Sequence, residues 1–306
     1  MSLKQQIAVQ PLGPGLFRSV NNPTRMGALS EFVFGGNTIA IAVNAAHQTL
    51  DSKYHLYSIC GYFIRPAITD RKLLCHVESI RDSKSFKTRQ IRVSQSTDDG
   101  SVKLCLIAFA DFHIEEPRSV VTYSTPPGII SSSDVLSHTN STTTTSIKKN
   151  SGLYRNIGCF FDLKPIPDNN PSREGAEQNL GADSIPSAPS MVTKEMFRMS
   201  EPLDNEAEQV SALAFYTDKG LAYLPAVHGR QDLWQASACA TLEFSLRIFA
   251  HGLNLRNWHF SEQKTLVAGN ARAFSEGRVW DENGSLVASM TQQTIFRPGP
   301  ELASRL

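Results

Sequence analysis

The stretch GGNTIAIAVNAAHQTL, residues 35–50, decides how the rest of the chain is interpreted. Gly35 and Gly36 suit a tight turn, and Asn37 directly after them is a residue type favoured at the N-cap of a helix. The alanine-rich, apolar residues that follow recur with helical spacing. The stretch therefore predicts a helix that opens a structural unit, and the segments after it decide which kind of unit.

Strand-length segments follow this helix. They are rich in β-branched and aromatic residues and are separated by turn signals such as TDDGS at residues 97–101. The four segments cover residues 55–65, 72–80, 85–95 and 102–113. A helix followed by a run of antiparallel strands is an α+β layout in which the sheet wraps around its one helix.

The second half of the chain repeats this layout. Residues 207–229 have the pattern of a helical segment, and strand candidates follow it at residues 239–250, 264–274, 276–282 and 285–296. The last hairpin keeps its spacing, because a phenylalanine follows the turn glycine by 12 residues in both halves, in the pairs Gly100 and Phe112, and Gly284 and Phe296. With the matching turns DDGS and ENGS, this predicts an internal duplication of one helix-then-sheet unit.

The composition changes between the two halves, after about Tyr123. Residues 124–189 are rich in Ser, Thr, Asn, Pro and Gly, which bury too little apolar surface to offset the entropy lost on ordering. We therefore predict a first unit over residues 1–123 and a low-complexity, partly disordered connector over residues 124–189, with one strand near CFFDL. The second unit is predicted to cover residues 190–306.

The overall composition excludes several classes of protein. With 306 residues, 41% of them hydrophobic, a soluble globular protein with a sizeable core is expected. A net charge of +1 offers no field for gripping a polyanion, so nucleic acid is not an expected partner. Five cysteines with no C-x-x-C pair indicate neither a disulfide framework nor a zinc cluster. No apolar run reaches the roughly 18 residues of a membrane span.

Familiar catalytic motifs do not occur in the sequence, which has no G-x-S-x-G, H-E-x-x-H, P-loop or G-x-G-x-x-G element. Three polar residues instead interrupt apolar segments of the second half: Asp218, Thr241 and Gln292. A buried carboxylate, hydroxyl and amide each require a hydrogen-bond partner, and burial raises the pKa of an aspartate toward values useful for proton abstraction. Together they would hold a water. Singly, they also fit a cap or turn residue, a strand former and an outward-facing strand residue.

Six blocks of the sequence together resemble the type II acyl-CoA thioesterases, a family with a double hot-dog fold. In the first half these are FGGNTIAIAVNAA, LYSICGYFIRPA and VESIRDSKSFKTRQIRVSQ, the last with Ser83 in place of the family's glycine. In the second half they are YTDKGLAYLPAVHG, CATLEF and GSLVASMTQQTIFRP. The resemblance implies that each half is one hot-dog, a long helix wrapped by an antiparallel sheet.

The same resemblance implies a reaction and a site. The family hydrolyses acyl-CoA to a carboxylic acid and CoA with a water oriented by an Asp, a Thr and a Gln, whose positions are taken here by Asp218, Thr241 and Gln292. Asp218 is expected to deprotonate the water, and a helix-start amide near Gly36 to bind the substrate oxyanion. Acyl-CoA is the expected substrate and no cofactor is expected. Lys219 departs from the family pattern, which has an aromatic or neutral polar residue there.

Other functions remain open at this level. One is a non-catalytic acyl-CoA-binding hot-dog protein, and another is a divergent enzyme that serves one pathway and acts on an acyl-CoA intermediate. A hot-dog hydratase or dehydratase is less favoured, because no closely spaced Asp and His precede a hot-dog helix. The acyl chain and the oligomeric state, a homo-oligomer included, are not decided by the sequence.

The printed sequence closes with Ser304, Arg305 and Leu306. This tripeptide differs from the peroxisomal signal Ser-Lys-Leu only in its basic residue, so a peroxisomal import receptor is an expected partner. Acyl-CoA hydrolysis is compatible with that organelle. We predict a peroxisomal protein, with the cytoplasm as the alternative.

Overall fold

The computed structural model describes residues 1–27, 31–127, 156–166, 190–229, 231 and 236–299. Its first half contains α1 (Leu3–Ile7), β1 (Val9–Gly13), β2 (Leu16–Ser19), α2 (Gly35–His47), β3 (Tyr54–Phe63), β4 (Leu74–Asp82), β5 (Phe86–Ser96) and β6 (Val102–Ile114). Its second half contains β7 (Phe161–Pro165), β8 (Thr193–Met199), α5 (Glu206–Thr217), α6 (Leu224–His228), β9 (Ala236–Ile248), β10 (His259–Gly269), β11 (Arg272–Trp280) and β12 (Leu286–Pro298).

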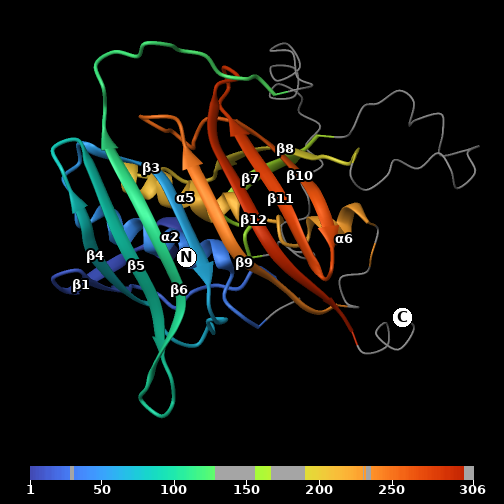
Figure 1. Ribbon diagram of the computed structural model, residues 1–306, viewed down its shortest axis with the longest axis horizontal. Coiled ribbons are helices and arrows are strands. Elements are labelled where there is room, and N and C mark those ends of the chain that lie inside the picture. The colour runs from blue at the N-terminus through green and yellow to red at the C-terminus, as the bar shows by residue number, and fades with distance from the viewer. Residues whose placement is uncertain (28–30, 128–155, 167–189, 230, 232–235, 300–306) are drawn as a thin grey trace, which may run out of the picture.

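The described strands form one antiparallel sheet with internal symmetry. Its order is β1-β2-β4-β5-β6-β3-β9-β12-β11-β10-β8-β7, so the two halves have the same strand sequence outward from the central pair, β3 and β9. Figure 1 shows α2 and α5 together behind the strands, on one face of this sheet. Each half is thus a helix covered by its own antiparallel sheet. This confirms the predicted α+β, double hot-dog fold.

The two last hairpin turns show the duplication at the level of single hydrogen bonds. The N–H of Thr97 donates to Ser101 O over 2.8 Å, and the N–H of Asp281 donates to Ser285 O over 2.9 Å. The glycine of each turn has a φ of 78°, a conformation that glycine adopts without a Cβ clash. The matching motifs DDGS and ENGS therefore form the same turn.

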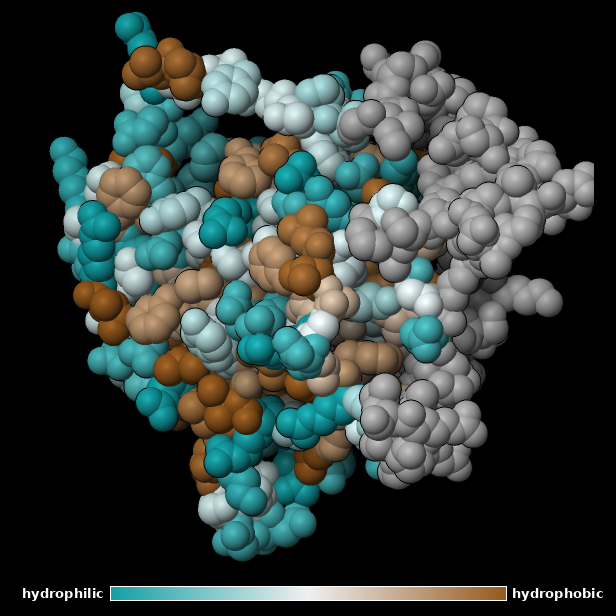
Figure 2. Space-filling view, turned by 45° about the vertical axis from the view of Figure 1, so that its right-hand side comes forward, coloured by the Kyte–Doolittle hydropathy of each residue, from teal (hydrophilic) through white to brown (hydrophobic). Residues whose placement is uncertain are grey.

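The helices are buried between the sheet and each other. Every residue of α2 from Gly36 to Ala46 is buried, as is every residue of α5 from Gln209 to Thr217. A helix that is apolar on nearly all sides needs such a position. The outer face of the sheet is mixed, and Figure 2 shows hydrophobic side chains scattered among hydrophilic ones. Phe109, for example, is exposed there, while its strand neighbours Ala108 and Ala110 are buried.

The start of α2 differs from the prediction. The N-cap position belongs to Phe34, which provides no side-chain cap, and Asn37 lies inside the first turn. The Asn37 side chain is buried and accepts hydrogen bonds from Thr24 N at 2.8 Å and Gln6 Nε2 at 3.0 Å. Asn37 therefore ties the N-terminal segment to α2, and the cap of this helix comes from elsewhere.

Two other elements were predicted with the wrong extent. The helical segment predicted over residues 207–229 is broken after Thr217, and the short α6 follows beyond Gly220, whose φ is 93°. The single strand predicted over residues 264–274 is a hairpin, because Asn270 and Ala271 adopt φ values of 51° and 54° between β10 and β11. Left-handed residues at both positions of a two-residue loop make this tight turn.

The sequence pattern did not reveal α1, β1, β2 and β8, which are short. The strand expected near CFFDL is β7, and it pairs with β8 at the edge of the second half. Most of the predicted connector over residues 124–189 lies outside the described residues, so the domain boundaries stay a prediction. None of the described helices combines the length and the apolar character that a membrane crossing requires.

Candidate functional site

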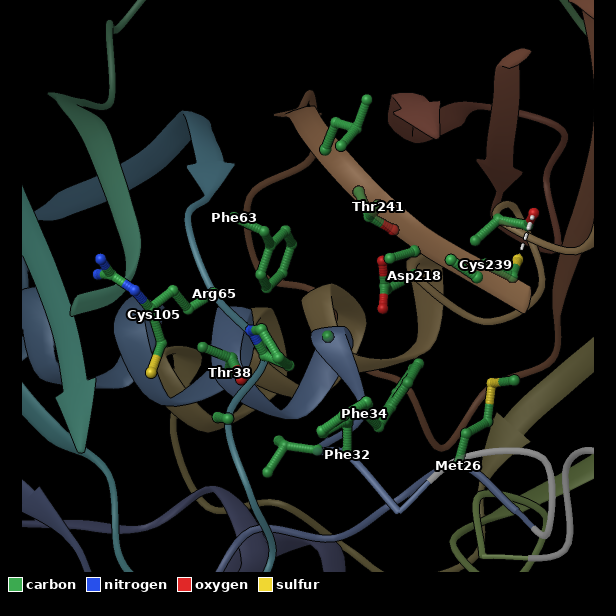
Figure 3. A pocket seen from close by; sticks show the side chains of 18 of the residues that line it. Met26, Phe32, Phe34, Thr38, Phe63, Arg65, Cys105, Asp218, Cys239 and Thr241 are labelled. Carbon is green, nitrogen blue, oxygen red and sulfur yellow. Dashed lines mark hydrogen bonds between the residues drawn. The ribbon is translucent and has the colours of Figure 1, made fainter. Parts of the chain in front are cut away.

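A cavity of about 510 Å³ lies where the two halves meet. Its walls are the start of α2, the segment that follows β3, the segment that follows α5 and the start of β9 (Figure 3). Its size is typical of small-molecule sites. Among the described residues, its lining contains one acidic side chain, Asp218, and one basic side chain, Arg65, and most of the remainder is apolar.

The three predicted site residues come together beside this cavity. Asp218 is the C-cap of α5, Thr241 lies on β9 and Gln292 lies on the adjacent strand β12. The Thr241 hydroxyl donates to Gln292 Oε1 over 3.2 Å, and Gln292 Nε2 donates to Asp218 Oδ1. Figure 3 shows the side chains of Thr241 and Asp218 facing each other at the wall of the cavity. A chain of hydrogen bonds therefore runs from the hydroxyl through the amide to the carboxylate.

This chain fixes the orientation of the Gln292 amide. Because the amide oxygen accepts from Thr241, the amide nitrogen must face Asp218. Gln292 is fully buried and Asp218 is 6% exposed, whereas Thr241 is half-buried. Asp218 and Thr241 both line the cavity and are open to a molecule in it, whereas Gln292 is not part of the lining.

The Asp218 carboxylate also caps α2. The backbone N–H of Gly36 donates to it, at a helix end whose first N–H groups lack intrahelical partners. A Cβ on Gly35 would lie 2.8 Å from Asp218 Oδ2, and a Cβ on Gly36 would lie 2.5 Å from Phe215 O. The glycine pair thus allows the start of α2 to approach the end of α5 closely.

Gly36 itself was predicted to bind substrate. Its N–H is engaged by Asp218, and Gly35 rather than Gly36 lines the cavity. The oxyanion role of Gly36 stays a prediction, and Gly35 becomes a second candidate for it. The motif FGG contains both glycines, so it was the available sequence signal for Gly35.

The environment of Asp218 changes its acidity. Burial raises its pKa to about 7, although the hydrogen bonds from Gln292 and Gly36 favour the ionised form and oppose the change. Desolvation penalises the charged carboxylate more than two donors compensate. A carboxylate that is half-ionised near neutral pH is able to accept a proton and to release it again.

A second buried network holds the segment that carries Asp218. Lys219 Nζ binds Glu195 Oε1 on β8, and the Tyr216 hydroxyl donates to the same oxygen over 2.6 Å. Gln263 Nε2 on β10 donates to the backbone oxygen of Lys219 over 2.8 Å. Lys219 and Glu195 are both buried. The lysine that departs from the family pattern is therefore paired, and its partner was not predicted because β8 was missed.

Other residues of the cavity were also missed by the sequence analysis. The Phe63 ring lies against the start of α2, 3.2 Å from the Cβ position of Gly35. Tyr223 lines the wall near Asp218, and burial, followed by the charges of Cys239 and Asp218, raises the pKa of its hydroxyl. Among the described residues, no three His, Cys, Asp or Glu side chains gather as metal ligands do.

Comparison with known proteins gives consistent matches. A family model described as the acyl-CoA thioesterase N-terminal domain matches residues 22–113, and one described as the acyl-CoA thioesterase C-terminal domain matches residues 170–296. Acyl-coenzyme A thioesterase 8 of Mus musculus is 22% identical, with 96% of this chain and 88% of the mouse protein covered. Acyl-CoA thioesterase 2 of Haemophilus influenzae is 22% identical, with 87% of each chain covered. The solved structure of acyl-CoA thioesterase II TesB2 from Mycobacterium marinum has a TM-score of 0.70 and 20% identity over 98% of both chains, a likeness in fold.

Proposed function

The chain belongs to the acyl-CoA thioesterase II family and hydrolyses acyl-CoA thioesters, and we propose that Asp218, Thr241 and Gln292 hold the attacking water. The products are a free carboxylic acid and CoA. The observation that carries the proposal is the hydrogen-bonded chain from Thr241 through Gln292 to a buried carboxylate at the cavity wall. Such a chain presents an acceptor for the water's proton and a hydroxyl that fixes the water's position.

The proposed reaction has two steps. In the first, the ionised carboxylate of Asp218 accepts a proton from the water while the water oxygen bonds to the thioester carbonyl carbon. The carbonyl oxygen becomes an oxyanion, and the N–H of Gly35, at the start of α2 and on the cavity wall, is placed to stabilise it. In the second, the carbon–sulfur bond breaks and the CoA thiolate takes the proton back from Asp218.

The raised pKa of Asp218 suits both steps. A carboxylate of ordinary acidity would accept the water's proton poorly, whereas one with a pKa of about 7 is a better base and is still ionised in part of the molecules at neutral pH. The leaving thiol resembles a cysteine thiol, with a pKa of about 8.5, so it leaves without a metal or a covalent intermediate being required.

The test is CoA release from a panel of acyl-CoA substrates by the wild type and by three variants. Asp218→Asn keeps the shape but removes the proton acceptor, so turnover should fall by roughly 10²-fold or more. Gln292→Ala should also lose turnover. The double variant should lose far less than the product of the two losses, because groups that position one water act as a unit.

Gln293→Ala is the matched control. Gln293 has the same side chain, is the next residue on β12 and therefore points to the other face of the sheet. Its turnover should stay within about twofold of the wild type, as is usual for a surface substitution. Near-normal turnover by Asp218→Asn would disprove the assigned water. It would also favour the interpretation of the chain as a divergent member that uses other residues.

We further propose that the protein enters peroxisomes through Ser304, Arg305 and Leu306, which lie outside the described residues. The support is the similarity of the tripeptide to Ser-Lys-Leu, and the proposal applies to a natural chain that ends at Leu306. A fluorescent protein fused to the N-terminus should give punctate signal that coincides with a peroxisomal marker. Fusion after Leu306 is the control and should abolish this pattern. Diffuse signal from the N-terminal fusion would favour the cytoplasm.

A further inference from the structure

The cavity has two chemically different sides. Figure 3 shows Asp218, Thr241 and Cys239 on one side and Arg65 with Cys105 on the other, with Phe63 between them. The side that holds Asp218 continues along the start of β9, whose cavity residues include the small side chains Ala236, Ser237, Ala238 and Ala240. The other side contains the only basic side chain of the lining among the described residues.

Arg65 is exposed at the rim of this cavity and is free to bind a ligand. Among the described residues it forms no ion pair and no side-chain hydrogen bond. Figure 3 shows Arg65 beside Cys105. Burial raises the pKa of the Cys105 thiol, and the Gln95 backbone and the charge of Arg65 oppose this change. An unpaired guanidinium at the mouth of an apolar cavity is suited to bind a carboxylate or a phosphate.

The backbone around Arg65 is fixed although its side chain is exposed. Ile64 N donates to Cys105 O on β6 over 2.8 Å, and the N–H of Val33 donates to Ala67 O over 2.9 Å. The segment that carries Arg65 is thus held between the sheet and the residues that precede α2. A charged group that starts from a fixed backbone loses less freedom on binding than one on a free loop.

We propose that Arg65 binds the phosphate groups of CoA, so that the CoA part of the substrate leaves the cavity on this side and the acyl chain occupies the alanine-lined side. The inference rests on the proposed function, because it takes acyl-CoA as the substrate. The phosphates are the only anionic groups of CoA, and the pantetheine arm that separates them from the thioester is uncharged. An anchor for them therefore belongs at the rim and away from the attacked carbonyl.

Phe63 links the two positions along the chain. A Cβ on Gly35 would lie beside both the Phe63 ring and the Asp218 carboxylate, so the ring is close to the reacting group. Arg65 follows Phe63 only two residues later. The chain that leaves β3 at Phe63 thus runs from the reacting group to the rim. The pantetheine arm would lie along residues 63–65, with its thioester at Asp218 and its phosphates at Arg65.

The test compares Arg65→Ala with the control Arg92→Ala on two substrates. Arg92 is an exposed arginine on β5 that does not line the cavity. With an acyl-CoA, Arg65→Ala should raise KM about tenfold and leave kcat within about twofold, as expected for the loss of a charged hydrogen bond at an exposed site. With the same acyl group on pantetheine, which has no phosphate, KM should not change. Arg92→Ala should leave both substrates unaffected.

Binding of CoA alone, measured by calorimetry, separates this inference from the proposed function. Arg65→Ala should weaken CoA binding about tenfold, whereas Asp218→Asn should bind CoA like the wild type even though its turnover is lost. An equal KM rise with acyl-CoA and acyl-pantetheine would overturn the inference, and so would unchanged CoA affinity in Arg65→Ala. A CoA substrate without the 3′-phosphate identifies which phosphate group binds Arg65. Loss of the Arg65 effect assigns the 3′-phosphate, and its persistence assigns the diphosphate.

Discussion

Asp218→Asn should change stability in opposite directions at low and at high pH. In the folded protein, burial raises the pKa of this carboxylate from its ordinary 3.8 to about 7. The folded chain therefore binds the proton more tightly than the unfolded chain does. The stabilisation from this group is fully present below pH 4 and is lost as the pH rises to about 7. The asparagine variant has no such loss, because its side chain does not ionise.

Two free-energy contributions decide whether the variant is more or less stable than the wild type at a given pH. A shift of roughly 3 pKa units corresponds to about 4 kcal/mol of unfolding free energy, which the wild type loses between pH 4 and pH 7. Against this, the amide side chain of the Asp218→Asn variant would offer one acceptor oxygen where the carboxylate accepts from both Gln292 and Gly36. An unmatched buried donor costs about 1–3 kcal/mol at any pH. The variant should therefore be less stable than the wild type at pH 4 and more stable by about 1–3 kcal/mol at pH 8.

The measurement is urea unfolding of both proteins at intervals from pH 4 to pH 8. The difference between the two free energies of unfolding is the relevant quantity, since the other ionisable groups contribute equally to both. A flat difference for Asp218→Asn would refute a burial-raised pKa. If the variant instead loses unfolding free energy relative to the wild type as the pH rises, the folded protein prefers the ionised carboxylate.

Three further outcomes are expected. The value of kcat/KM should rise about tenfold per pH unit up to about pH 7 and then level off, because only the ionised form of Asp218 accepts a proton. A flat profile between pH 5 and pH 7 would contradict this role. Gly36→Ala should lower both the melting temperature and turnover, because its Cβ would lie 2.5 Å from the backbone oxygen of Phe215, whereas Gly13→Ala, with open space around its Cβ position, should leave turnover unchanged. Glu195→Gln should cost about 3–5 kcal/mol of unfolding free energy by removing the carboxylate that Lys219 binds, and combination with Lys219→Met should recover most of this loss if the ion pair is the cause.

The parts of the fold that were predicted correctly depend on local chemistry. Gly100 and Gly284 each occupy a left-handed turn position, and the residues that form each turn lie next to them in the sequence. The hairpin at Asn270 and Ala271 uses the same backbone region, with its glycine, Gly269, just before the two left-handed positions. The dipeptide Gly269-Asn270 was a local turn signal that the prediction did not use. The N-cap of α2 was misassigned for a different reason. Asn37 has the right side chain for a cap, but tertiary contacts place it inside the helix.

The site depends on contacts that no local pattern contains. Thr241 and Gln292 are 51 positions apart in the sequence, and Gln292 and Asp218 are 74 positions apart. Each residue singly also fits an ordinary structural role, so only the resemblance to a family selected the three together. Glu195 lies outside the blocks that resemble the family, and Arg65 lies within one of them, LYSICGYFIRPA, but the resemblance gave it no role. Their significance follows from a buried lysine on another element and from the outline of a cavity, both of which require the folded chain.

A duplicated fold contains two equivalent helix starts, and among the described residues these two starts are capped differently. The difference accounts for the proposed acid–base site lying at only one of them. The α5 helix is capped locally, since Asn205 accepts from the N–H of Glu208 over 2.9 Å. The α2 helix begins after Phe34, which has no capping side chain, so its first amides attract the carboxylate of Asp218 from the end of α5. The corresponding residue at the end of α2 is Gln48, which cannot act as a base. The missing local cap at α2 therefore draws a buried carboxylate to the wall of the cavity, where the same burial that destabilises its charge makes it a stronger base.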